Sequence, residues 1–127
     1  MAKSRSTIAV AQADQSVEAV LEQVLQLGVR IPQPQAVAAY LQQHPKLLTV
    51  MVPIVQIARQ RLPDATLSLE LYIDPEIDDK YLTLYARFPT YEPSTMARID
   101  AVCEEYEPLL EHAHSWLLLT TDYRLPD

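Results

Sequence analysis

Hydrophobic residues near the start of the chain recur at helical spacing. After Ser16, apolar side chains return every three or four residues for about three turns. Ser16 is a suitable N-cap, because its hydroxyl can accept a hydrogen bond from the first turn. Gly28 stands where this helix would end, and glycine favours the left-handed conformation that closes many helices. The pattern therefore predicts a first helix between these two residues.

Prolines separate the next two predicted helices. Pro32 and Pro34 indicate an extended connector, since a proline disfavours helix in the residue before it. A short helix with apolar residues on one side follows and ends at His44. Pro45 suits the first turn of a third helix, which we expect to run to Arg61.

The third predicted helix is apolar on almost every side. Such a helix is usually buried between layers or in a dimer contact. Pro53 lies inside it, and the β-branched residues nearby leave a strand over Thr49–Val55 as an alternative.

Two later segments alternate strictly between apolar and polar residues. The first covers Thr66–Ile73, the second covers Tyr81–Arg87, and a short turn over Asp74–Asp79 joins them. Alternation with period two is typical of a strand with one buried face. The segments predict an antiparallel hairpin with Leu67, Leu69, Leu71, Ile73, Leu82, Leu84 and Ala86 on its buried face.

A fourth helix, capped by Ser94 or Thr95, and a third strand over Trp116–Thr121 complete the prediction. The order is ααα-ββ-α-β. The last helix provides the crossover that brings the third strand into the sheet of the hairpin. We expect an α+β fold of two layers with an antiparallel or mixed three-stranded sheet. Residues 1–14 are predicted to form a flexible tail, and residues 15–127 a single domain.

Composition narrows the function classes. The 127 residues include one glycine and one cysteine, which argues against glycine-rich phosphate loops, disulfides within the chain and cysteine-rich zinc sites. Cys103 lies on an apolar helical stripe and no Gly-x-Ser-x-Gly motif occurs, so we expect no enzyme and no cofactor. No apolar run is long enough to span a membrane, and no export signal is visible. These features predict a cytoplasmic protein.

Charge divides the chain into two unlike halves. Residues 1–61 carry a balance of +3, residues 62–127 carry −10, and the whole chain carries −7. A strongly acidic surface repels phosphates, so we expect no nucleic acid partner. The same surface can attract a basic protein.

Two groups of residues are candidates for protein contact. The predicted turn is the densest acidic feature, formed by Asp74, Glu76, Asp78 and Asp79. It departs from the calcium loop of EF-hands at the sixth and twelfth positions, so we expect no metal there. The polar side of the hairpin carries Tyr72, Tyr81, Tyr85 and Arg87. Tyrosine and arginine are enriched in protein interfaces.

A third candidate lies at the end of the last strand. Asp122 and Arg124 can line a small pocket with Arg87 if the fold brings them together.

We therefore expect a non-enzymatic protein-interaction domain, most simply a homodimer. Its contact would be the tyrosine-bearing sheet face or the apolar third helix. The first alternative is an acidic neutraliser of a basic partner, of the antitoxin or immunity kind, acting through the turn carboxylates. The second is a small-molecule-binding domain built around Arg87, Asp122 and Arg124.

Overall fold

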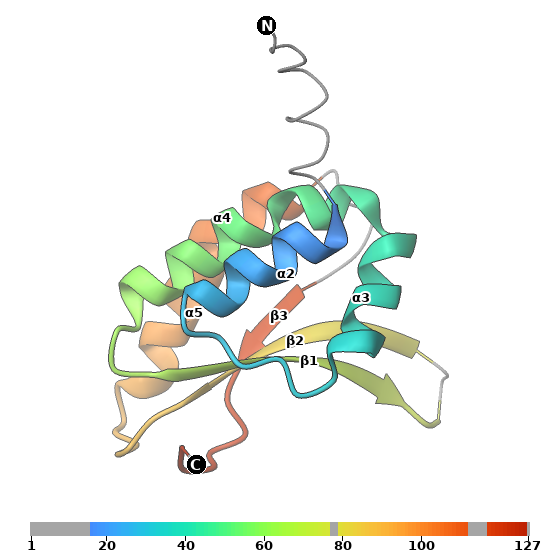
Figure 1. Cartoon of the computed structure of the whole chain (residues 1–127). Helices are drawn as coiled ribbons and strands as arrows, with labels where there is room; N and C mark the ends of the chain where they lie inside the picture. The colour runs from blue at the N-terminus through green and yellow to red at the C-terminus, as the bar shows by residue number, and fades with distance from the viewer. Residues whose placement is uncertain (1–15, 77–78, 112–116, 127) are drawn as a thin grey trace, which may run out of the picture.

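The structure is a computed structural model that describes residues 16–76, 79–111 and 117–126. The predicted tail over 1–14 lies outside these residues. Within these described residues, four helices and a three-stranded mixed sheet follow one another in the order ααα-β-β-α-β, which confirms the predicted α+β fold. The helices gather on one face of the sheet, and the C-terminal segment leaves the sheet on the opposite side (Figure 1).

The elements lie close to their predicted bounds. The helices are α2 (Val17–Gln26), α3 (Pro34–Gln43), α4 (Pro45–Arg61) and α5 (Thr95–Leu110). The strands are β1 (Thr66–Asp74), β2 (Asp79–Arg87) and β3 (Leu117–Thr120).

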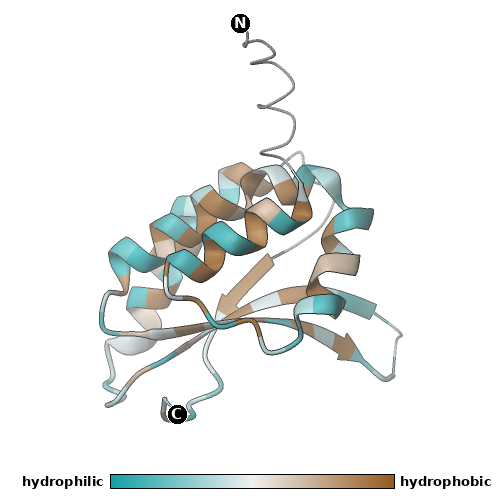
Figure 2. Ribbon diagram, viewed as in Figure 1, coloured by the Kyte–Doolittle hydropathy of each residue, from teal (hydrophilic) through white to brown (hydrophobic). Residues whose placement is uncertain are grey.

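The central strand of the sheet is β2. It pairs antiparallel with β1, with Ser68 opposite Tyr85, and parallel with β3, with Leu84 opposite Leu119. The parallel pairing is possible because α5 returns the chain to the end of the sheet at which β2 begins. Apolar and polar residues alternate along β1 and β2, and the described part of β3 is mostly apolar (Figure 2).

The helix ends follow the local chemistry expected of them. The Ser16 hydroxyl accepts a hydrogen bond from the Ala19 amide at 3.1 Å, as an N-cap does. Gly28 has φ +83°, the left-handed region that favours glycine, and it ends the first helical segment. Ser94 is the N-cap residue of α5, one of the two predicted positions, but its side chain makes no capping hydrogen bond. Instead the Thr95 hydroxyl accepts from the Glu92 amide.

The segment 49–55 is helical, so the strand alternative for it is wrong. Helix α4 packs against α2, α3 and α5 and places Leu47, Met51, Ile54 and Val55 in the core. Not all of the apolar side chains of α4 are buried in the core, since Val50, Val52 and Ile57 are only partly buried.

The outer end of the hairpin departs from the predicted burial. Leu67 and Leu69 are fully buried, whereas Leu71 is partly buried and Ile73 is 52% exposed. All four side chains project to the helical side, because residues two apart share a face. The strands therefore extend beyond the helices that cover the sheet, and alternation alone does not reveal where that cover ends.

Candidate functional site

The face of the sheet opposite the helices is the candidate site. Alternation along the observed strands places the polar residues of the hairpin on this face. We call it the open face and define it by Thr66, Ser68, Glu70, Tyr72, Asp74, Asp79, Tyr81, Thr83, Tyr85, Arg87, Leu118 and Thr120. The predicted interface residues Tyr72, Tyr81, Tyr85 and Arg87 all belong to it.

Tyrosine rings occupy the hairpin end and the middle of the open face. Tyr72 lies directly opposite Tyr81, and their ring centroids are 5.0 Å apart. Tyr85 lies under the guanidinium of Arg87, whose central carbon is 5.2 Å from the ring centroid. Partial burial, and then the charge of Glu70, raises the pKa of Tyr85. The Tyr85 hydroxyl therefore stays protonated at neutral pH, and the three rings present amphipathic contact area.

An ion-pair cluster occupies the other end of the open face. Arg87 donates to both carboxylate oxygens of Asp122, at 3.2 and 2.8 Å, and to Glu70 at 3.4 Å. Glu70 also accepts from the Ser68 hydroxyl at 2.8 Å. Glu70 stands opposite Thr83 rather than Arg87, so the arginine side chain reaches diagonally across the strands. The cluster holds the side chains of this end in place.

The electrostatics of this cluster stabilise its charged form. Hydrogen bonding from Arg87 lowers the pKa of Asp122, and burial opposes this effect only in part. The same hydrogen bond raises the pKa of Arg87. Both groups are therefore ionised throughout the physiological pH range.

One buried hydroxyl on the open face has no partner. Thr83 is 2% exposed, and its side-chain oxygen makes no hydrogen bond. A buried polar group without a partner costs stability, so such groups are rare in folded proteins. The sequence does not single out Thr83, since a threonine on a strand carries no sign of how its hydroxyl is bound.

The C-terminal segment after β3 borders the open face. The Tyr91 hydroxyl donates to the Arg124 carbonyl and also contacts the Thr121 hydroxyl at 3.2 Å. Tyr123 has φ 60°, and its ring centroid lies 5.3 Å from that of Tyr91. Tyr123 is 61% exposed despite this fixed backbone.

The predicted pocket of Arg87, Asp122 and Arg124 is brought together only in part. Arg87 and Asp122 form the ion pair described above, while Arg124 contributes its backbone amide to Asp122 at 3.2 Å and leaves its side chain exposed. An anion would have to compete with two carboxylates for the Arg87 guanidinium. The arrangement thus resembles a structural clamp more than a vacant binding site.

The predicted acidic turn is described except for Asp78, which lies outside the described residues. Asp74, Glu76 and Asp79 belong to the described part. Asp74 accepts a hydrogen bond from the Glu76 amide, and Asp79 accepts one from the Lys80 amide. Asp74 and Asp79 are also directly opposite each other on the open face.

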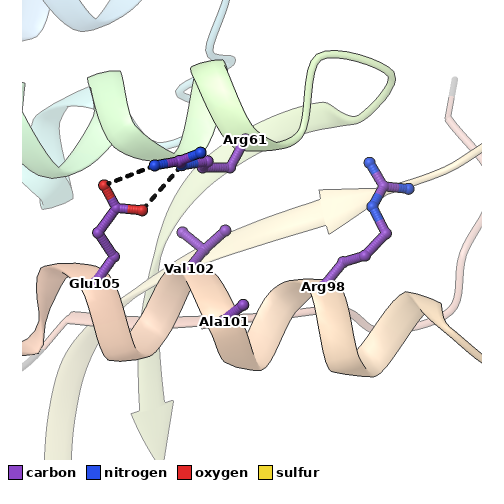
Figure 3. A pocket seen from close by; sticks show the side chains of 5 residues that line it. All are labelled: Arg61, Arg98, Ala101, Val102 and Glu105. Carbon is purple, nitrogen blue, oxygen red and sulfur yellow. Dashed lines mark hydrogen bonds and ion pairs between the residues drawn. The ribbon is translucent and has the colours of Figure 1, made fainter.

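A groove lies between α4 and α5, away from the sheet (Figure 3). Its volume is about 230 Å³, and its walls are Arg61, Arg98, Ala101, Val102 and Glu105. Arg61 is paired with Glu105 at 2.9 Å, and Arg98 with Asp64 at 2.6 Å. Both guanidinium groups are therefore already engaged by carboxylates.

Other chemistry has little support within the described residues. Burial raises the pKa of the Cys103 thiol, which favours its inert protonated form. No group of three or more metal-ligating side chains comes together there. None of the described helices combines the length and apolar character needed to cross a membrane.

Comparisons with protein-family models, with curated proteins and with solved structures gave no match for this chain.

Proposed function

We propose that the chain is a non-enzymatic protein-interaction domain that forms a homodimer through the open face. The observation that carries the proposal is that the helices cover only one face of the sheet. Helices bury one face, while the other carries three tyrosines, of which Tyr72 is 38% exposed. Aromatic residues above an ordered polar framework are typical of protein contacts.

The strand edges provide fewer places for a partner. At the outer edge of β1, Arg30 exchanges two backbone hydrogen bonds with Leu67 and Leu69, and the Gln33 side chain accepts from the Leu71 amide. At the outer edge of β3, the Tyr106 hydroxyl binds both Leu117 and Leu119. Strand addition would have to displace these contacts, whereas face-to-face docking displaces none of them.

The competing prediction is a basic protein bound at the acidic turn. Asp74 and Asp79 each accept a backbone hydrogen bond within that turn, so the fold already uses one oxygen of each carboxylate. The open face therefore carries our proposal. The proposal includes a cytoplasmic location, which the free thiol of Cys103 supports.

The test is the oligomeric state in solution. Light scattering over a concentration series should give a mass near twice 14.4 kDa for the wild type. Tyr81→Lys should weaken dimerisation at least tenfold, because it places a charge on the contact face. Leu109→Lys is the matched control, since Leu109 is an exposed apolar residue of α5 on the helical layer. A wild type that stays monomeric at high micromolar concentration contradicts the proposal.

A further inference from the structure

We propose that Tyr123 is the anchor residue of this homodimer, which pairs opposite ends of the two open faces. In this arrangement Tyr123 of each copy packs on Tyr72 and Tyr81 of the other copy, and Arg124 meets the carboxylates of Asp74 and Asp79. The inference rests on the proposed function and adds its geometry. It follows from three features of the described surface. They are the exposed Tyr123, the aromatic pair of Tyr72 and Tyr81 with two carboxylates beside it, and the distance between these two ends of the open face.

The first feature is the fixed conformation of Tyr123. Its φ of 60° lies in the left-handed region, which is disfavoured for side chains other than glycine, asparagine and aspartate. The Thr121 hydroxyl accepts a hydrogen bond from the Tyr123 amide at 3.1 Å. Tyr91 holds the next residue through the Arg124 carbonyl. The chain thus keeps a disfavoured conformation in which a large aromatic residue remains 61% exposed. Ordering a ring before binding lowers the entropy cost of the contact.

The second feature lies at the hairpin end of the open face. The rings of Tyr72 and Tyr81 form a pair with Tyr72 38% exposed, so they offer an aromatic surface. Beside them, Asp74 and Asp79 stand directly opposite each other. Like charges directly opposite in a hairpin are unfavourable. Within the described residues no basic side chain forms an ion pair with either carboxylate. Lys80, the basic residue of this end within the described part of the chain, lies opposite Ile73 on the other face of the sheet.

Arg124 is the complementary charge at the opposite end. Its side chain is exposed, and the described residues contain no ion pair to it. Arg87 is unsuited to the same role, because Asp122 and Glu70 already engage its guanidinium. Among the described residues, one copy therefore presents an arginine without an ion pair next to an exposed tyrosine, and carboxylates without an ion pair next to an aromatic pair.

The third feature is the spacing, which selects the symmetry. Tyr81 and Arg87 are six residues apart on β2, a length of about 20 Å. Consider a two-fold axis that lies in the plane of contact, runs perpendicular to the strands and passes near Thr83 and Tyr85. Such an axis places each end of one open face over the opposite end of the other open face. An axis parallel to the strands would stack the four carboxylates of Asp74 and Asp79 on one another. Charge complementarity favours the perpendicular axis, and the resulting contact is isologous.

The first experiment separates the ring of Tyr123 from its backbone. Asparagine tolerates the left-handed region, so Tyr123→Asn removes the ring and retains the backbone conformation. We expect the dimer dissociation constant, measured by sedimentation velocity, to rise at least tenfold, while the unfolding midpoint of the monomer does not fall. Tyr123→Phe, which keeps the ring, should dimerise within about threefold of the wild type. Unchanged dimerisation of Tyr123→Asn would overturn the inference.

The second experiment tests the pairing of opposite ends by charge reversal. At 0.15 M salt, where the repulsion between net charges is largely screened, Arg124→Glu and Asp79→Lys should each weaken their own homodimers at least fivefold. Each variant places two like-charged contacts in the interface. An equimolar mixture of the two variants should restore dimers, since both contacts of the mixed dimer again join opposite charges. If the mixture behaves as the sum of its components, the opposite-end geometry is wrong.

These outcomes are distinguishable from failure of the proposed function. A wild-type monomer removes the homodimer itself. A wild-type dimer that Tyr81→Lys weakens, but that neither Tyr123→Asn nor the charge reversals affect, supports the open face as the contact and overturns only the geometry proposed for it.

Discussion

The Tyr106 hydroxyl takes the place of a neighbouring strand at the outer edge of β3. It donates to the Leu117 carbonyl at 2.9 Å and accepts from the Leu119 amide at 3.0 Å. The ring is 1% exposed, and burial raises the pKa of its hydroxyl well above the usual range. The group is therefore always protonated and can donate and accept at once.

Tyr106→Phe should lower the free energy of unfolding by about 2–4 kcal/mol, because it leaves two buried backbone groups of β3 without a partner. Urea denaturation provides the measurement, with an unchanged m-value expected. Tyr72→Phe is the control, since its partly exposed hydroxyl should contribute within about 0.5 kcal/mol. Equal stability of Tyr106→Phe and the wild type would show that water or a shifted side chain satisfies the strand edge.

Single residues differ in how far the sequence reveals their role. Alternation by itself is enough to place Tyr72, Tyr81 and Arg87 on one face. The diagonal contact from Arg87 to Glu70 depends on register, which the turn length alone leaves open. Helical spacing predicts Tyr106 only as part of an apolar stripe, and the position of β3 beside α5 is what gives its hydroxyl two partners.

Helix α4 contains a proline in its interior, and tertiary packing stabilises the helix despite it. Pro53 lies inside the helix at an exposed position, and it has no amide hydrogen to offer the Thr49 carbonyl one turn earlier. The apolar residues on the buried side of α4 pack against α2, α3 and α5. Burial of that side compensates for the missing hydrogen bond.

Pro53→Ala should raise the free energy of unfolding by about 2 kcal/mol. Removing an interior proline gains about 3 kcal/mol in the helix, and the more flexible unfolded chain returns up to about 1 kcal/mol of this gain. Gln56→Ala, also exposed and inside α4, serves as the control and should change stability by only a few tenths of a kcal/mol. A destabilised Pro53→Ala would mean that the core requires the helix shape that proline imposes.

Elements are easier to predict than the relations between them. Apolar spacing, Ser16, Gly28 and Pro45 place the helix ends, because each acts through neighbours in sequence. The local sequence pattern does not show how far along the hairpin the helices cover the sheet. Alternation therefore predicts that Ile73 is buried, whereas the residue is exposed. The direction of β3 likewise depends on the crossover as a whole, and the sequence pattern allows an antiparallel or a mixed sheet.

The whole molecule carries a charge of −7, which affects any contact that it makes. Two such charges at a centre separation of about 25 Å repel by roughly 8 kcal/mol in water without salt. The two exposed ion pairs proposed between Arg124 and the hairpin carboxylates contribute only about 0.2–1 kcal/mol each. Long-range repulsion therefore exceeds local attraction when the charges are unscreened.

Salt should consequently strengthen the homodimer. The Debye length falls from about 30 Å at 0.01 M to about 8 Å at 0.15 M, so the repulsion between copies is largely screened at physiological ionic strength. We expect the dissociation constant, measured by sedimentation velocity, to decrease at least tenfold over this range. A basic partner at the acidic turn predicts the opposite dependence, because salt would screen its attraction to the −7 protein. Self-association that weakens as sodium chloride is added would show that local ion pairs, rather than net charge, control how two copies meet.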